Sequence, residues 1–343
     1  MKTLLNTLYV QTQGALLRLD HDTLKVEVEG RPRLQVPLHH LGSLVLFGEV
    51  CVTPALLARC AADGRTVAWL SLHGRFQARV EGPVSGNVLL RRAQHEALDD
   101  PHRPREIARH LVAGKLRNLR TVLLRGAREA EGPEAAAPLS QAARHLAELL
   151  RELPQASHLE EIRGLEGDAS RRYFAAFPHL LLGEGEVFTF RGRNRRPPLD
   201  PVNALLSFLY TLLLHDCVGA LEGVGLDPQV GFLHALRPGR PALGLDLMEE
   251  LRPILGDRLA LTLLNRRQLT EKDFDRRPGG AVLLNEAGRK KVLVAYQERK
   301  QQEITHPFLE QKLPLGLVPH LQARLLARHL RGELSAYPPY LHH

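Results

Sequence analysis

The spacing of apolar and polar positions divides the chain into two parts. In the first part, short apolar segments recur between turn signals, and Val26 and Val28 alternate with charged neighbours. This two-residue period is typical of half-buried strands. One helix is predicted among the strands, beginning after the N-cap residue Thr53 and ending at Gly64. We therefore expect residues 1–82 to form a small, β-sandwich-like domain with one helix.

Beyond this domain, the apolar positions take the three-to-four-residue spacing of helices. After a predicted linker at 83–88, helices are expected at 103–130, 140–152, 156–177, 201–222, 286–302 and 316–333, with another starting near Asp246. The stretch 131–140 contains glycine and proline and is predicted to be a loop. The expected fold class is α+β, with a larger all-α domain over 89–343 that carries the functional site.

The composition is that of a two-domain protein, since 343 residues that are 44% hydrophobic can bury a sizeable core. The apolar stretch at 204–214 is too short to span a bilayer, and the first residues lack the apolar segment and cleavage site of a signal peptide. We therefore expect a soluble, cytoplasmic protein with no membrane partner. Cys51, Cys60 and Cys217 form no CxxC pair and are expected to act as small buried hydrophobes.

The formal net charge of +8 indicates a polyanionic partner, and nucleic acid is the first candidate. Most of the cations are arginines, which suit bidentate phosphate contacts, although a genome rich in arginine codons would give the same excess. Candidate phosphate contacts lie on two predicted helices and in one loop, and each can equally belong to a solvated face. These candidates are Lys115, Arg117, Arg120, Arg237, Arg289 and Lys290.

One carboxylate lies on an otherwise apolar helix face. On a helix over 160–177, Glu166 falls on the same stripe as Ile162, Ala169 and Tyr173. A buried carboxylate is costly unless it is paired with a cation or bound to a metal. Glu166 is therefore a candidate metal ligand, unless it meets an arginine in the core or lies at the edge of the stripe.

A second candidate cluster lies in HALRPGRPALGLDLMEELRP. His234 precedes a Gly- and Pro-rich loop, and Asp246, Glu249 and Glu250 follow it. If Asp246 starts a helix, the three acids lie on neighbouring faces of its first turn. The alternative is equally physical, because an Asp at a helix start with a Glu three residues later is also a capping arrangement. A lone histidine is commonly a surface or core residue.

Taken together, Glu166, His234 and the acids after the loop form a mixed nitrogen and oxygen set. Such a set suits Mn²⁺ or Mg²⁺ better than a structural zinc ion, which favours thiolates. In a basic protein, the ion would neutralise a phosphate and lower the pKa of an attacking hydroxyl. The residues thus indicate phosphodiester chemistry on DNA, RNA or a small nucleotide. The alternative is a non-catalytic nucleic-acid-binding module whose acids form caps and salt bridges.

Several stretches resemble motifs of the CRISPR adaptation integrase, the first CRISPR-associated protein family. RGLEGDASRRYFAAF resembles its G-x-E-G-x-A-x-R-Y-F motif, and GFLHALRPGRPALGLDLMEELRP resembles its histidine loop and D-L-M-E-E-x-R-P helix. LDPVNALLSFLYTLL resembles its asparagine-bearing helix, in which Asn203 either caps the helix or bonds to the site. EITHPF resembles a C-terminal element. The resemblance covers nearly the whole chain. Within the family, the chain resembles the members of subtype I-C.

This resemblance implies an N-terminal β domain that helps to form a homodimer and a helical domain with a Mn²⁺ or Mg²⁺ site. Position by position, it places the metal ligands at Glu166, His234 and Glu249, with Asp246 as a further catalytic acid. Glu250 is expected to be a solvated or hydrogen-bonding neighbour. The implied partners are double-stranded and branched DNA, as prespacer and CRISPR repeat, and the second CRISPR adaptation protein.

The reaction that the resemblance implies is the insertion of new spacers into a CRISPR array. The 3′-OH of a prespacer strand attacks the repeat DNA by direct transesterification, without a covalent enzyme intermediate. With water as the nucleophile, the same site is a DNA endonuclease. No dedicated general base is required, since a bound metal ion lowers the pKa of the hydroxyl.

Overall fold

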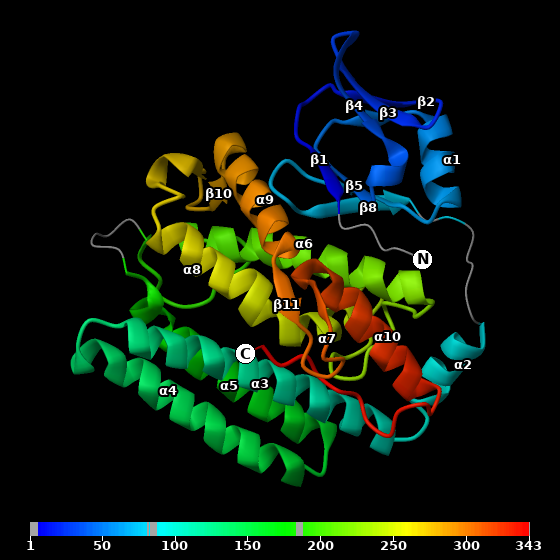
Figure 1. Ribbon diagram of the computed structural model, residues 1–343. Helices are drawn as coiled ribbons and strands as arrows, with labels where there is room; N and C mark the ends of the chain where they lie inside the picture. Colours follow the sequence, from blue (N-terminus) through cyan, green and yellow to red (C-terminus); the bar gives the residue numbers. More distant parts are fainter. Residues whose placement is uncertain (1–5, 81, 83–87, 183–187, 343) are drawn as a thin grey trace.

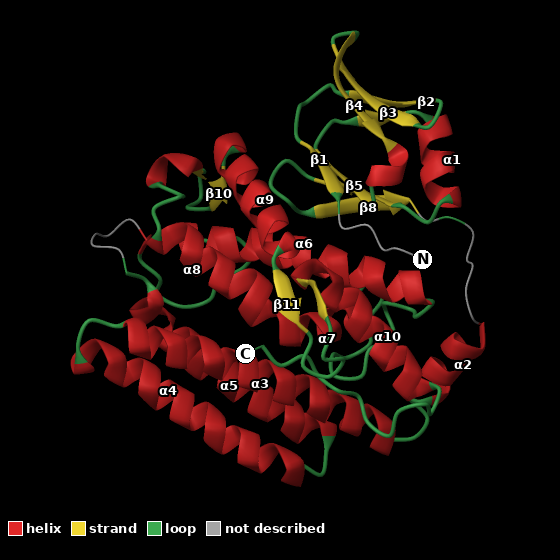
Figure 2. Ribbon diagram, in the orientation of Figure 1, coloured by secondary structure: helices red, strands yellow, loops and turns green. Residues whose placement is uncertain are grey.

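The computed structural model describes residues 6–80, 82, 88–182 and 188–342, and most of the predicted linker at 83–88 lies outside them. Figure 1 shows a small part built from strands, in blue, on one side of a larger helical body. Figure 2 shows the same division by secondary structure. The expected α+β class, with strands first and helices after them, is confirmed.

Two four-stranded sheets and one α-helix make up the small part, with strand orders β1-β5-β7-β8 and β4-β3-β2-β6. Leu17, Leu44, Leu56 and Val67 come from both sheets and from the helix, and they are fully buried in one shared core. The elements are β1 (Thr7–Val10), β2 (Leu16–Asp20), β3 (Thr23–Val28), β4 (Arg31–Pro37), β5 (Ser43–Phe47), β6 (Cys51–Val52), α1 (Pro54–Ala62), β7 (Thr66–Leu70) and β8 (Phe76–Val80).

The helical body contains α2 (Val88–Glu96), α3 (His102–Glu129), α4 (Pro133–Glu152), α5 (Leu159–Ala176), α6 (Pro201–Val224), α7 (Ala242–Leu251), α8 (Arg258–Asn265), α9 (Glu286–Gln301) and α10 (Val318–Leu330). A π-helical turn, η5 (Arg252–Asp257), joins α7 to α8. In Figure 1, α3, α4 and α5 lie side by side, and α3 also packs against α7. This packing brings residues from three distant segments of the chain to one place.

Three sequence expectations for the helical body are corrected. The predicted loop at 131–140 is largely helical, because α4 begins at Pro133, a residue suited to a first turn, and continues through three alanines. The helix predicted to start at Asp246 begins four residues earlier, at Ala242. The body is also not wholly helical, since it holds two two-stranded sheets: β9 (Phe274–Arg276) with β10 (Val282–Leu284), and β11 (Glu303–Thr305) with β12 (Lys312–Pro314).

The helix α6 is the central apolar element of the body. Among the described residues, it alone is long and apolar enough to cross a membrane by length and composition. However, 67% of its most apolar window is buried inside the protein, where it packs against α7 and α10. The place of α6 in the core thus explains its apolar character. The helix, Pro201–Val224, is longer than the apolar stretch at 204–214 that was judged too short to span a bilayer.

The strand-built part packs on the helical body through one of its sheets. Phe47 of β5 stacks on Phe208 of α6 with ring centroids 6.0 Å apart. Phe76 of β8 contacts the ring of His215 on α6 at 5.1 Å. Val45, Phe47 and Leu70 accordingly belong to the core of the helical body rather than to that of the small part.

His215 in this contact gives a pH-dependent prediction. Burial lowers its pKa to about 4. The unfolded chain therefore takes up a proton below about pH 6.5, whereas the folded chain does not until about pH 4. We expect His215 to make the free energy of unfolding about 2 kcal/mol lower at pH 5 than at pH 7. Urea unfolding at both pH values should show this difference reduced in His215→Leu, and an unchanged pH dependence in that variant would contradict it.

Candidate active site

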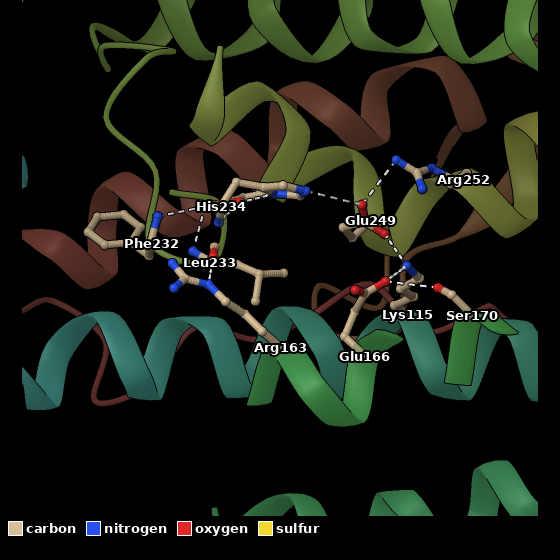
Figure 3. Close-up of polar contacts among 10 residues, drawn as sticks. Lys115, Arg163, Glu166, Ser170, Phe232, Leu233, His234, Glu249 and Arg252 are labelled. Carbon is tan, nitrogen blue, oxygen red and sulfur yellow. Dashed lines mark hydrogen bonds and ion pairs between the residues drawn. The ribbon is translucent and has the colours of Figure 1, made fainter. Parts of the chain in front are cut away.

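Glu166, His234 and Glu249 come together between α5, α7 and the loop that joins α6 to α7 (Figure 3). Glu166 lies on α5, and its stripe neighbours Ile162, Ala169 and Tyr173 are buried as expected. The Glu166 side chain itself is 25% exposed, whereas that of Glu249 on α7 is 3% exposed. Nε2 of His234 lies 3.8 Å from Oε1 of Glu249.

Asp246 shapes the loop that carries the histidine. It is fully buried, and its Oδ2 accepts hydrogen bonds from the backbone N–H of Phe232 at 2.6 Å and of Leu233 at 2.9 Å. Its Oδ1 accepts from the backbone N–H of His234 at 2.9 Å and pairs with Nδ1 of that ring at 2.6 Å. Asp246 therefore fixes the ring and leaves Nε2 facing Glu249, and it does not cap α7.

Two further contacts hold the same loop in place. Nε of Arg163, on α5, donates to the carbonyl oxygen of Leu233 at 2.6 Å (Figure 3). Gly231 has no room for a side chain, because a Cβ there would lie 2.8 Å from Oδ2 of Asp246 and 2.7 Å from the carbonyl carbon of Ala242. The histidine is thus positioned by a rigid loop.

Lys115, a phosphate contact predicted from the sequence, lies between the two glutamates instead. Nζ of Lys115, on α3, forms ion pairs with Oε1 of Glu166 and with Oε2 of Glu249, the latter at 2.5 Å (Figure 3). The Lys115 side chain is only 3% exposed. The prediction of a surface phosphate contact at Lys115 is therefore corrected, because burial under the acids keeps its ammonium from the surface.

Glu249 is an ionised carboxylate in a buried position. Burial by itself would raise the pKa of Glu249, but the nearby charges of Arg252, Lys115 and His234 outweigh it and lower the pKa to about 2. Nη2 of Arg252 lies 3.0 Å from Oε1 of Glu249. The guanidinium of Arg252 also stacks over the ring of Tyr210 at 4.8 Å. The site therefore keeps a permanent negative charge at Glu249 throughout the neutral pH range.

Glu250 is hydrogen-bonded but not solvated. It is fully buried, and its carboxylate accepts hydrogen bonds from the Tyr337 hydroxyl at 2.5 Å, from Nε2 of Gln322 at 3.0 Å and from the Tyr340 N–H at 2.8 Å. Burial raises the pKa of Glu250 to about 7 in spite of these bonds. The role of Glu250 therefore differs from that of Glu249, because its hydrogen bonds tie α7 to the segment around Tyr340.

An open cleft of about 760 Å³ lies against the glutamates and the histidine. Apart from those three residues, its polar lining is dominated by arginines: Arg171, Arg191, Arg193, Arg195, Arg240 and Arg252. None of the six was among the phosphate contacts predicted from the sequence, although the run RGRNRR at 191–196 was a signal for three of them. Arginines at this density suit a phosphate backbone.

Asn203 holds the arginine-rich segment against α6. Its Oδ1 accepts from Nη1 of Arg193 at 2.6 Å and from the backbone N–H of Asn194 at 3.0 Å, and its Nδ2 donates to the carbonyl of Gly192 at 2.8 Å. The helix cap is supplied by Asp200, whose Oδ1 accepts from the Asn203 backbone N–H at 2.7 Å. Of the two roles open to Asn203 from the sequence, the side chain therefore takes the one directed at the site.

The other predicted phosphate contacts lie outside this cleft. Arg237, Arg117 and Lys290 are exposed, and Arg120 is partly buried. Arg289 is 6% exposed, and its Nη1 donates to the Leu284 carbonyl at 2.8 Å. The prediction for Arg289 is thus corrected, because its guanidinium is used inside the protein.

The donor set fits a divalent metal ion in its chemistry. Across the described ranges, no three His, Cys, Asp or Glu side chains stand close enough together to enclose an ion as they are. However, the ion pair with Lys115 is the polar contact that Oε2 of Glu249 makes among the described residues, and Asp246 favours the His234 tautomer whose Nε2 can act as a ligand. Lys115 already supplies a positive charge at this point. Glu166, His234 and Glu249 are therefore the residues that would hold an ion.

Known proteins match this chain along its length. A family model described as CRISPR associated protein Cas1 matches residues 8–298. The CRISPR-associated endonuclease Cas1 1 of Moorella thermoacetica is 59% identical over 342 residues, which cover 100% of both chains. A casposase bound to integration product has a TM-score of 0.84 at 21% identity, over 98% of this chain and 94% of that one. A Cas6-RT-Cas1–Cas2 complex has a TM-score of 0.83 at 24% identity, over 99% of this chain and 36% of that one.

The whole-chain match to curated endonucleases assigns this protein to the enzymes that cut phosphodiester bonds. More narrowly, the chain belongs to the CRISPR-associated Cas1 family. The family and the class of enzyme expected from the motifs are thereby confirmed. The two solved structures are less than 25% identical to this chain and support its fold. Subtype I-C stays a prediction.

Proposed function

We propose that this chain is a DNA endonuclease and integrase that uses Mn²⁺ or Mg²⁺ to insert new spacers into a CRISPR array. The observation that carries the proposal is the buried, permanently ionised Glu249 beside Glu166 and Nε2 of His234, at the wall of a cleft lined by arginines. A divalent ion bound there would lower the pKa of an attacking hydroxyl and stabilise charge on the phosphate.

The protein's own residues position both the site and the DNA in this proposal. Asp246 holds the histidine ring, and the arginines of the cleft bind the phosphates on either side of the reacting one. Arg193 is oriented by Asn203, and Arg252 by Tyr210 and Glu249. Because these groups are fixed before DNA arrives, the site loses little free energy in ordering side chains during the reaction.

The partners are double-stranded and branched DNA, a second copy of this chain and the second CRISPR adaptation protein, in the cytoplasm. Residues 1–82 are proposed as the dimerising domain and residues 89–343 as the catalytic one. A relative of this fold occurs in a structure named as a complex with Cas2, which makes that protein the partner to test.

A substrate panel tests the choice of DNA. Duplex DNA, branched DNA and single-stranded RNA would each be incubated with the protein in Mn²⁺ and in EDTA. We expect metal-dependent nicking of DNA, most of all at branches. Cutting of RNA alone would instead identify a phosphodiesterase that acts on RNA, and tight binding of DNA with no cutting of either would identify a binding module.

A further inference from the structure

Lys115 is buried between two carboxylates, whereas most lysines lie on the protein surface. Its side chain is 3% exposed, and its ammonium group contacts one carboxylate from α5 and another from α7. The hydroxyl of Ser170 donates to the same Oε1 of Glu166 at 2.8 Å. Burying a lysine ammonium group costs free energy unless nearby negative charges offset it. The two acids therefore determine where the ammonium group of Lys115 lies.

Lys115 also contacts the atoms that a divalent ion would use. Among the described residues, the polar partner of Oε2 of Glu249 is the ammonium group of Lys115, 2.5 Å away. Nη2 of Arg252 lies 3.0 Å from the other oxygen, Oε1 of Glu249, so the two cations contact different oxygens of this carboxylate. Two cations cannot share this small space without strong repulsion, since unit charges about 4 Å apart interact strongly away from bulk water.

We propose that Lys115 is a built-in cation that holds Glu166 and Glu249 together before the metal ion binds, and that the ion displaces its ammonium group from between them. This inference rests on the proposed metal-dependent function. It follows that the acid pair is assembled in the absence of metal, because Lys115 offsets the repulsion of the two carboxylates. It also follows that Lys115 weakens metal binding, since the ion must replace an interaction that is already made.

A second buried lysine provides a matched control. Lys300 on α9 is 4% exposed, and its Nζ contacts both carboxylate oxygens of Asp216 at 3.0 and 2.9 Å. Its ammonium also lies 5.6 Å from the centre of the Tyr296 ring. Lys300 is therefore a paired, buried lysine like Lys115, but its acid is not one of the proposed metal ligands.

The test compares Lys115→Met with Lys300→Met by two measurements that do not depend on catalysis. Isothermal titration calorimetry gives the Kd for Mn²⁺, and thermal unfolding in EDTA and in saturating Mn²⁺ gives the melting temperature. Both variants should melt at a lower temperature than the unmodified protein in EDTA, because each leaves a buried or partly buried carboxylate without its cation. Mn²⁺ should restore most of the lost melting temperature in Lys115→Met but not in Lys300→Met. The Kd for Mn²⁺ should be at least tenfold lower in Lys115→Met than in the unmodified protein, and Lys300→Met should not show this decrease.

The outcomes separate this inference from the proposed function. An unchanged or raised Kd in Lys115→Met, with Mn²⁺ still bound by the unmodified protein, would overturn the role of Lys115 and leave the metal site standing. Binding of Mn²⁺ by neither protein would overturn the metal site itself. If Lys115→Met does not fold in EDTA, Lys115→Gln is used instead, because its amide NH₂ group can still donate hydrogen bonds. Recovery of folding by Mn²⁺ in either variant would support displacement. Failure of Mn²⁺ to help either one would contradict it.

Discussion

Glu166→Ala is expected to abolish metal-dependent cleavage of DNA while leaving the protein folded. The variant removes one of the three proposed ligands and one of the two partners of Lys115, so the remaining acid, Glu249, is neutralised by Lys115 and Arg252. A metal ion that supplies about 4 kcal/mol of transition-state stabilisation corresponds to a loss of about 10³-fold in rate. The Glu166 side chain is 25% exposed, so its removal leaves no large cavity.

Nicking rates in Mn²⁺, thermal unfolding and DNA affinity would be measured for this variant beside Glu160→Ala. Glu160 lies on the same helix, its side chain is 78% exposed, and it forms an ion pair with the neighbouring Arg163 at 3.2 Å. The control should cut DNA at the rate of the unmodified protein. If Glu166→Ala retained cleavage, the catalytic site would lie elsewhere in the chain.

Asp246→Asn is expected to lose both stability and activity. Each carboxylate oxygen of Asp246 has two hydrogen-bond partners, so an asparagine NH₂ group leaves either the N–H groups of Phe232 and Leu233 or the N–H of His234 without an acceptor. In the second orientation the NH₂ group also favours the His234 tautomer that carries its proton on Nε2. Leaving one or two buried donors unpaired should cost about 2 kcal/mol of the free energy of unfolding. The released His234 ring should lower metal affinity and activity by about 10–100-fold, the usual effect of losing the residue that orients a metal-binding histidine.

The matched control is Asp227→Asn at the start of the same loop. Asp227 accepts one backbone N–H, from Gln229 at 2.8 Å, and this bond is local and exposed. Urea unfolding and Mn²⁺ titration should therefore show a small change in this control and a large one in Asp246→Asn. Equal effects in the two variants would mean that Asp246 does no more than stabilise a turn.

The residues of the site were predictable where their pattern was local. Glu166 stood out because a carboxylate lay on an apolar stripe, and His234 and Glu249 because family motifs carried them. Of the two roles open to Asp246 from the sequence, the capping role is excluded, since α7 begins four residues before it, at Ala242. The helix at Pro133 was missed because its prolines were taken as signs of a loop.

What the sequence did not reveal was which charged residues are buried. Lys115 and Arg289 belong to basic runs that are typical of a solvated face, yet tertiary packing turns both inward. Glu250 was expected to reach solvent or a hydrogen bond, and the segment around Tyr340, 90 residues further along the chain, covers it. Such contacts join distant segments, so no periodicity within one helix can indicate them.

The central claim is that Glu166, His234 and Glu249 form a metal-dependent site for phosphodiester transfer on DNA. The most direct test is a strand-transfer assay with a 3′-OH prespacer and repeat DNA, in Mn²⁺ or EDTA, with the second CRISPR adaptation protein present and absent. The account predicts transfer products in Mn²⁺ that disappear in EDTA and in His234→Ala. Tight DNA binding without products under any metal, even with the partner protein present, would contradict it.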